Sequence, residues 1–292
     1  MKVIIGVVPG ESSDDALALG GLLCQALGAQ AVLTHIHPAA YDYASPGHVD
    51  AEWEKYLIDE SRSFMTSAVE RAREFGIDDP GQIIFGHRSS GVGLAEVAQA
   101  EGAEMIVIGS APGASNGRFQ IGSTADQLLH GSHVPVALAP SYYRGIRPEA
   151  IGRIVAAFQN STESRAAAAT AADLARAAGT PITLLTVLIR HRMYGSAIRH
   201  GEDLVLEQLH ADVAAEQERV RDEVCGGLEA DCVITSGDDA MSALRRHDWE
   251  GDEVLVLASA KGGVVRRVFL GDMTYKLVRA TSVPALVLPR HT

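Results

Sequence analysis

The sequence predicts an α/β protein of two tandem domains, each a five-stranded parallel sheet with helices on both faces. The first reason is a repeat: residues 107–140 recur in degraded form as residues 256–289, with Gly122 matching Gly271. The second is the alternation of short apolar runs with amphipathic segments, which is typical of parallel sheets covered on both faces. The third is the length of 292 residues, which suits two domains of about 145 residues.

The first half opens with an apolar, β-branched run at 2–8, which predicts a buried strand ending at the Pro9-Gly10 turn. Ser12 and Ser13 then predict the N-cap of an amphipathic helix with an acidic first turn. Further strands are expected at 31–36, 82–85, 105–108 and 134–138, and helices at 14–28, 49–75 (entered through a Pro46-Gly47 turn), 92–100 and 123–129.

The second half repeats this order after a polar segment that contains proline and glycine. We therefore expect a first domain at 1–140, a linker at 141–150 and a second domain at 151–292. Strands are expected at 154–158, 182–188, 232–235, 254–257 and 283–288, and helices at 162–178, 202–224, 240–246 and 273–279.

The fifth strand of each half is expected at a sheet edge. Pro135 and Pro284 fall near the starts of these strands, and proline cannot donate to a sheet ladder. Such edges can pair with one another, joining the two halves or joining two chains. We expect a homodimer formed through the fifth strands.

The composition is that of an ordinary globular protein with an acidic surface. Hydrophobic residues make up 47% of the chain, charged residues 21%, and the formal net charge is −12. A negative field repels nucleic acid and anionic membranes, so we expect neither as a partner. No run approaches the roughly 18 apolar residues of a membrane-spanning helix. Because the amino terminus also turns acidic too early for a signal peptide, we expect a cytoplasmic protein.

The three cysteines, Cys24, Cys225 and Cys232, predict no disulfide framework. An odd, sparse set in a chain of this length favours a reducing compartment. We interpret them as small buried hydrophobic residues.

The glycine loop after the fourth strand is the strongest candidate for a ligand site. Ligands of open α/β sheets bind at the carboxyl ends of the strands, where a helix N-terminus offers free N–H groups to an anion. Gly122 would let a phosphate approach the backbone, Ser123 and Thr124 add hydroxyl groups, and Arg118 could add a charge. The alternative is that this Gly-Ser-Thr sequence only caps a helix.

The loop resembles the nucleotide-binding motif of the universal stress protein family: glycine, two residues, glycine, nine residues, glycine, then serine or threonine. Here Gly109, Gly122 and Ser123 match it, while Pro112 stands in the second glycine position with Gly113 one step later. The resemblance covers nearly the whole chain and implies two Rossmann-like (adenine nucleotide alpha hydrolase-like) domains. It also implies a non-catalytic stress-response protein that binds ATP.

The resemblance further implies a set of binding residues in the first domain only. The family's aspartate after the first strand is replaced here by Pro9-Gly10, and Ile36 matches the apolar residue that contacts adenine. The implied adenine-nucleotide pocket comprises Pro9, Gly10, Ile36, Gly109, Gly113, Gly122, Ser123 and Thr124.

The second half departs further from the motif. Gln159 stands in the aspartate region, Val187 in the adenine position, Ala258 and Lys261 in glycine positions, and Asp272 after Gly271. A carboxylate at Asp272 would repel phosphate but would serve well at a helix start. We expect a retained scaffold and a lost phosphate site, with Lys261, Arg266 and Arg267 as solvated loop charges.

Other chemical candidates are weaker. His35 and His37 could share one face at a strand end, and His130 and His133 flank a helix end, but no third metal ligand is evident. Ser115 lies in a GxSxG sequence, yet in mid-loop rather than at a strand-to-helix elbow. The charged run 216–223 predicts a solvated helix face.

Three functions stay open at this point. The leading one is a regulatory protein that binds ATP, at most in its first domain, and acts through protein partners that the sequence does not identify. The second is an interaction module that binds no nucleotide. The third is a slow ATPase.

Overall fold

The computed structural model describes residues 1–39, 50–189, 199–259 and 272–289, which form two compact units, Met1–Glu149 and Ala150–Thr292. Each unit is an α/β structure of parallel strands flanked by helices, so the predicted fold class is confirmed. Most strands are buried almost throughout because helices cover both faces of the sheet, whereas the strands at 81–86 and 230–237 are mostly half-buried.

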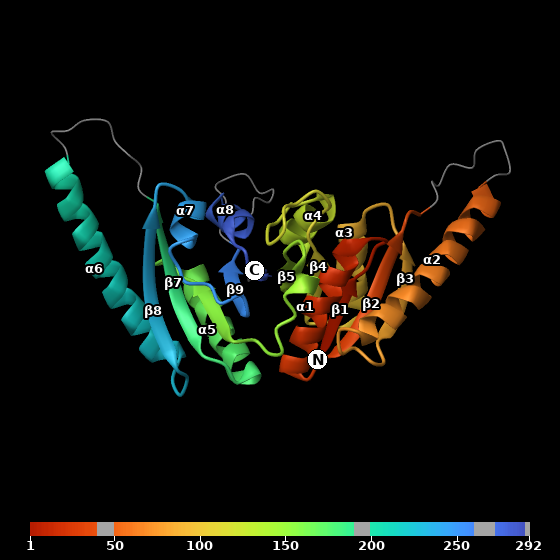
Figure 1. Ribbon diagram of the computed structural model, residues 1–292, viewed down its shortest axis with the longest axis horizontal. Helices are drawn as coiled ribbons and strands as arrows, with labels where there is room; N and C mark the ends of the chain where they lie inside the picture. Colours follow the sequence, from red (N-terminus) through yellow and green to blue (C-terminus); the bar gives the residue numbers. More distant parts are fainter. Residues whose placement is uncertain (40–49, 190–198, 260–271, 290–292) are drawn as a thin grey trace. The chain divides into compact units, whose positions relative to one another are not determined.

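The first unit has the strand order β3-β2-β1-β4-β5, with neighbouring strands parallel. Helices α1 and α2 contact one another, as do α3 and α4 (Figure 1). Its elements are β1 (Lys2–Gly6), α1 (Glu11–Leu27), β2 (Gln30–His37), α2 (Asp50–Arg73), β3 (Gly81–Gly86), α3 (Ser90–Glu101), β4 (Met105–Gly109), α4 (Ser123–Gly131), β5 (Val136–Ala139) and a 3-10 turn, η1 (Tyr143–Gly145).

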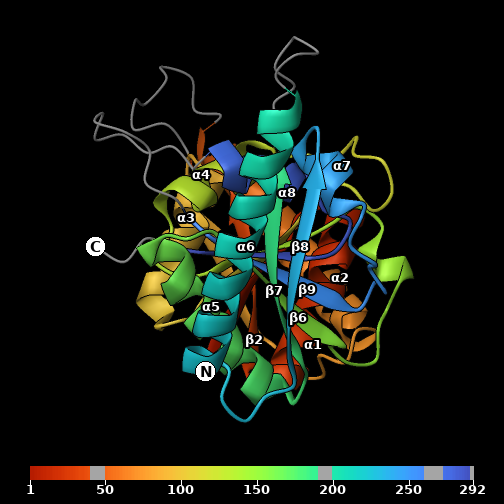
Figure 2. The same ribbon diagram turned by 90° about the vertical axis from the view of Figure 1, so that its left-hand side faces the viewer.

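The second unit repeats this order as β8-β7-β6-β9-β10. Figure 2 shows α5 beside α6 against its sheet. Its elements are β6 (Arg153–Ala157), α5 (Thr162–Ala178), β7 (Ile182–Ile189), α6 (Arg199–Val224), β8 (Ala230–Gly237), α7 (Ala240–Leu244), β9 (Glu253–Ala258), α8 (Asp272–Ala280) and β10 (Ala285–Leu288).

The predicted serine cap of the first helix is wrong. Helix α1 begins at Glu11, so Ser12 and Ser13 lie inside its first turn, and its N-cap is Gly10 with φ +115°. The Ser13 hydroxyl instead bonds the backbone N–H and carbonyl of Val8, while the Ser12 hydroxyl donates to the Ser110 carbonyl at 2.8 Å. The Ser13 hydroxyl therefore bonds the turn after β1, the Ser12 hydroxyl bonds the segment after β4, and no side chain caps the helix.

Several predicted strand limits differ from the observed ones by one or two residues. Strand β1 ends at Gly6, because the chain turns through Gly10 into α1. Strands β5 and β10 begin one residue after Pro135 and Pro284, whose missing N–H groups suit a position just outside the ladder. The predicted Pro46-Gly47 turn lies outside the described residues.

The polar segment after β5 packs onto the first unit. The Asp15 carboxylate, buried in α1, accepts the backbone N–H groups of Tyr142 at 3.0 Å and Arg144 at 2.9 Å. The Arg144 guanidinium lies 3.2 Å from the same carboxylate, and the neighbouring Tyr143 ring is buried. The segment is thus fixed by contacts that are remote in sequence.

The cysteines form no disulfide. Cys24 and Cys225 are buried, as predicted, while Cys232 is half-buried. Burial raises the pKa of the Cys24 thiol to about 11, so this thiol is protonated at neutral pH. Within the described residues, no helix is long and apolar enough to cross a membrane.

Candidate functional site

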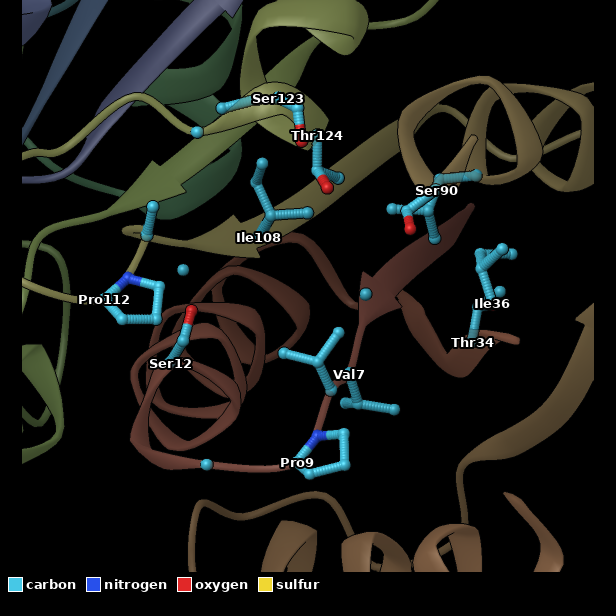
Figure 3. Close-up of a pocket in the computed structure, with 18 of the residues that line it drawn as sticks. Val7, Pro9, Ser12, Thr34, Ile36, Ser90, Ile108, Pro112, Ser123 and Thr124 are labelled. Atoms are coloured by element: carbon cyan, nitrogen blue, oxygen red, sulfur yellow. The ribbon is translucent and has the colours of Figure 1, made fainter. Parts of the chain in front are cut away.

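A cavity of about 280 Å³ lies in the first unit at the carboxyl ends of β1 and β4. The strand order reverses between these two strands, and this is where open α/β sheets hold their ligands. Figure 3 shows the lining side chains converging from several elements. They are Gly6, Val7, Val8, Pro9, Gly10, Glu11, Ser12, Thr34, Ile36, Ser90, Leu94, Ile108, Gly109, Ala111, Pro112, Gly122, Ser123, Thr124 and Ala125.

The structure brings the residues implied by the family resemblance together at this cavity, with one exception. Gly113 does not line it. It adopts φ +92° in the loop between β4 and α4, a conformation that favours glycine for backbone reasons alone. Pro112, in the second glycine position of the motif, does line the cavity. Sequence reasoning missed Thr34, Ser90 and Leu94.

Two helices begin at the cavity without a side-chain cap. Helix α4 has Gly122 as its N-cap and α1 has Gly10, and neither cap makes a side-chain hydrogen bond. The first N–H groups of a helix have no partner one turn earlier. In α1 the Ser13 N–H bonds back to the N-cap carbonyl of Gly10 at 3.3 Å. The positive ends of both helix dipoles therefore meet the cavity, which favours an anion there.

At the third helix beside the cavity, α3, a side chain of the neighbouring helix accepts a hydrogen bond from the first turn. Helix α3 starts at Ser90, and the Gln127 side chain of α4 accepts the Gly91 N–H at 3.1 Å and the Ser89 hydroxyl at 2.6 Å. This amide fixes α3 to α4 and satisfies one donor of α3. The free N–H groups are accordingly concentrated at α1 and α4.

Gly109 has a packing role beside any role in ligand approach. A Cβ built on Gly109 would lie 2.1 Å from the Ser12 carbonyl oxygen and 2.6 Å from its hydroxyl. Only glycine lets the start of α1 sit this close to the end of β4. At Gly122 the corresponding atom would lie 2.9 Å from the Ala111 Cβ, a milder restriction.

The charge in the cavity comes from one acidic side chain. Glu11 is 81% exposed and pairs with the Arg144 guanidinium at 2.7 Å. The described lining includes neither lysine nor arginine, and Arg118, predicted to contact phosphate, is not part of it. An anionic group would therefore be held by N–H dipoles and hydroxyls rather than by a cationic side chain.

The end of the cavity beside β2 is largely apolar. Ile36 is 8% exposed and Leu94 3%. A Cβ on Gly93 of α3 would lie 3.2 Å from the Ile36 side chain, so α3 packs closely against Ile36 in this part of the cavity wall. A flat apolar group with a few polar edges fits such a surface.

The second unit differs at the matching positions. Gln159 is exposed, Val187 is 7% exposed and Ala258 ends β9. Asp272 is the first residue of α8, at the helix start as predicted. Residues 260–271, which include Lys261, Arg266, Arg267 and Gly271, lie outside the described residues.

The histidines serve local contacts. His35 Nδ1 lies 3.0 Å from the Val7 carbonyl, its ring packs 5.0 Å from that of Phe64, and burial lowers the pKa of His35. His130 Nδ1 lies 2.6 Å from the Asp126 carbonyl one helical turn earlier. Across the part of the chain that the structure describes, no group of His, Cys, Asp or Glu could hold a metal ion.

The remaining sequence candidates resolve as follows. Ser115 lies in a turn where its carbonyl accepts the Arg118 N–H at 3.0 Å, in mid-loop as predicted.

The run 216–223 is not simply a solvated face, because Gln217 is 1% exposed. Its amide donates to the Leu184 carbonyl at 2.9 Å and the Val233 carbonyl at 3.1 Å. Periodicity misses such a residue because a buried polar contact is set by tertiary structure.

The comparisons with known proteins agree with this architecture. A model described as the Universal stress protein family matches residues 1–140 and 150–289. A universal stress protein of Mycobacterium tuberculosis is 30% identical over 298 residues, covering 99% of this chain and all of the relative.

A solved structure that spans nearly the whole chain shows the same fold. A universal stress protein of Archaeoglobus fulgidus superposes with a TM-score of 0.65 at 16% identity, over 99% of this chain and 98% of the other. A universal stress protein solved in complex with cAMP covers 48% of this chain and 97% of its own, at 19% identity and a TM-score of 0.38.

Proposed function

Since the chain belongs to the universal stress protein family, with two such domains in tandem, we propose that its first unit binds an adenine nucleotide, ATP. The observation that carries the proposal is the cavity into which α1 and α4 begin at uncapped glycines, Gly10 and Gly122. The protein then acts in the stress response through conformation and protein partners rather than through turnover.

The cavity has two ends of different chemistry, which suit the two ends of a nucleotide. Gly122, Ser123 and Thr124 gather N–H groups and hydroxyls at one end, where the phosphates would lie. Ile36 and Leu94 form the apolar wall at the other end, where the base would lie. The proposed binding residues are therefore Pro9, Gly10, Ile36, Gly109, Gly122, Ser123 and Thr124, with Pro112 in place of Gly113.

A second function, an interaction module that binds no nucleotide, has one specific observation in its favour. The described lining offers Glu11 as its charge and no cationic side chain, which weakens the attraction for phosphate. Adenine nucleotide released from freshly purified, denatured protein and identified by mass spectrometry would exclude this alternative. Slow ATP hydrolysis, the third alternative, is measured in the same preparation as phosphate release above the buffer rate.

The test of the proposed function is Ser123→Asp, which gives the first unit the residue that the second unit carries as Asp272. An exposed carboxylate in the first turn of α4 suits the helix dipole, so folding should be unchanged. The same carboxylate repels phosphate, so ATP affinity in isothermal titration should fall by about tenfold or more. Ser123 is preferred to Gly122→Glu because a side chain at Gly122 meets Ala111.

Ser132→Asp is the matched control, since Ser132 lies at the opposite end of α4. It should leave ATP affinity unchanged. If wild-type protein at millimolar ATP gives neither heat nor thermal stabilisation, the nucleotide proposal is wrong. If Ser123→Asp binds ATP as tightly as wild type, the phosphates do not lie at α4.

We also propose, from the sequence, domain limits of 1–140 and 151–292, a cytoplasmic location and association of two chains through the fifth strands. Strands β5 and β10 each end the strand order of their own unit, which leaves an edge for pairing. Light scattering of the purified chain tests the association. A mass equal to one chain at all concentrations would exclude it.

A further inference from the structure

A buried hydroxyl in the wall of the cavity, that of Thr34, has no partner among the described residues. Thr34 is 1% exposed, and its Oγ1 makes no hydrogen bond within the described residues. The Thr34 carbonyl is paired with the Val7 N–H at 2.9 Å, so only the side chain is unsatisfied. A buried hydroxyl without a partner destabilises a fold, and natural proteins rarely keep one without a reason.

The part of the cavity wall that contains Thr34 is largely apolar. Thr34 lies opposite Gly6 in the β1–β2 register, and both residues line the cavity. The position of a Cβ on Gly6 is 3.0 Å from both the Ile108 and Leu94 side chains, so these two close the wall around the strand pair. A ligand seated against Leu94 and Ile108 is the available source of a hydrogen bond to Thr34.

The second unit demonstrates that the scaffold does not need a hydroxyl here. Its strand pair β6–β7 places Leu185 opposite Ala157, as β1–β2 places Thr34 opposite Gly6. The Phe158 N–H donates to the Leu185 carbonyl at 2.8 Å, the same bond that holds Thr34. Leu185 is 1% exposed and apolar. The polar residue is therefore specific to the unit that has the cavity.

Thr34 also lies at a defined end of the cavity. In Figure 3, Thr34 and Ile36 line the side opposite Pro112 and Ser12. The N–H groups of α4 are offered at Ser123, away from Thr34. A ligand with its phosphates at α4 thus directs its base toward β2.

We propose that Thr34 is a specificity-determining residue, whose hydroxyl forms a hydrogen bond with a heteroatom of the bound base. The inference rests on the proposed nucleotide function and adds to it a contact that recognises the base. A threonine hydroxyl both donates and accepts, so it pairs with a ring nitrogen or an exocyclic amine. Because Oγ1 is covered in the ligand-free protein, this contact requires a local side-chain movement when the base binds.

The test is Thr34→Val, which removes the hydroxyl and keeps the branched shape. Titration with adenosine and with ATP should show the same loss of affinity, about five- to tenfold for each, because both ligands carry the base. The ligand-free variant should melt about 2–4 °C higher than wild type, since an unpaired buried hydroxyl is removed. Ser123→Asp should show the contrasting result, weakening ATP but not adenosine.

Thr186→Val is the matched control in the second unit. The Thr186 hydroxyl is buried but paired, donating to the Phe158 carbonyl at 2.9 Å and accepting from Gln217 at 3.0 Å. This variant should melt about 2–4 °C lower and bind adenosine and ATP as wild type does.

The outcomes separate the two proposals. If the wild-type protein binds neither adenosine nor ATP, both the proposed function and the proposed base contact of Thr34 are wrong. Wild type binding both ligands while Thr34→Val binds them equally well overturns the base contact alone, and assigns the hydroxyl to a buried water. Loss of affinity for ATP but not adenosine also overturns it, because the hydroxyl would then lie beside phosphate.

Discussion

The two units differ most where their helices begin. In the first, α1 and α4 start at glycine N-caps without a side-chain bond. In the second, α5 starts with a reciprocal capping box between Ser161 and Ser164, and α7 with one between Asp239 and Ser242. Two of the second unit's helices thus satisfy N-terminal N–H groups with their own N-cap side chains, whereas α1 and α4 of the first unit do not. The N-cap of α8, the counterpart of α4, lies outside the described residues. A side-chain cap pairs N–H groups that a helix start otherwise leaves without an intrahelical partner, so it stabilises the helix locally.

The two units also differ near the carboxyl ends of their strands. The first unit has Gly6, Thr34 and Gly109 where the second has Ala157, Leu185 and Ala258. Each change in the second unit is toward a larger or less polar side chain. The second sheet is therefore packed for stability at positions that border the cavity in the first.

The largest effect is expected at Asp15, the fifth residue of α1. The fifth residue of α5, the first helix of the second unit, is Ala166. Asp15→Ala leaves two backbone N–H groups without their acceptor, and it leaves the Arg144 guanidinium with the exposed Glu11 carboxylate as its partner. It also removes the hydrogen bond to the Tyr142 N–H, which holds Tyr142 in a left-handed conformation with φ 68°. We expect a loss of about 3–5 kcal/mol, measured by urea unfolding followed for each unit.

Glu11→Gln is the control for this prediction. Glu11 pairs with the same Arg144 but is 81% exposed, so its removal should cost less than about 1 kcal/mol. Equal effects of the two variants would show that the buried carboxylate is not what anchors the segment after β5.

A methyl group at the end of β4 should have the next largest effect. Gly109→Ala gives the first unit the alanine of Ala258, but its Cβ meets the Ser12 carbonyl at 2.1 Å. We expect a loss of about 1–3 kcal/mol from the displacement of α1. The reciprocal Ala258→Gly should cost only about 0.5–1 kcal/mol. A harmless Gly109→Ala would contradict the packing role and leave close ligand approach as the reason for glycine.

The sequence predicts the elements well because strand and helix signals are local. Apolar β-branched runs locate the strands, and the repeated loop identifies Gly122 and its helix. The contacts of Asp15 could not be predicted, because its partners Tyr142 and Arg144 lie more than a hundred positions away along the chain. Thr34 was missed because its chemistry depends on lacking a partner, which only a folded structure reveals.

The cap of α5 tests the comparison of helix starts at a smaller scale. Ser161→Ala removes an oxygen that accepts the Ser164 N–H at 3.1 Å, so the second unit should lose about 1 kcal/mol. Ser89→Ala is the matched control, because Ser89 is the N-cap of α3 but makes no capping bond. It removes the hydroxyl that donates to Gln127 at 2.6 Å, and the same Gln127 oxygen still accepts the Gly91 N–H. The control should lose less than half as much. Equal losses would remove the distinction between capped and uncapped helices.

The smallest predicted effect concerns a histidine that replaces a hydroxyl in the first unit. His35 bonds the Val7 carbonyl at 3.0 Å, as Thr186 bonds the Phe158 carbonyl at 2.9 Å. Burial lowers the pKa of His35 below its ordinary value of 6.5. The folded state then binds fewer protons than the unfolded state just below pH 6.5, so stability falls as the pH decreases from there toward the folded pKa.

His35→Thr should remove this pH dependence from the first unit, because the introduced hydroxyl can donate to Val7 at every pH. Burial also lowers the pKa of His247, so the second unit keeps its own decline in the same pH range and provides an internal reference. Urea unfolding at pH 7.5 and at pH 5.5 measures both units. A first unit that still loses stability at pH 5.5 after the substitution would show that His35 is not the group whose protonation destabilises it.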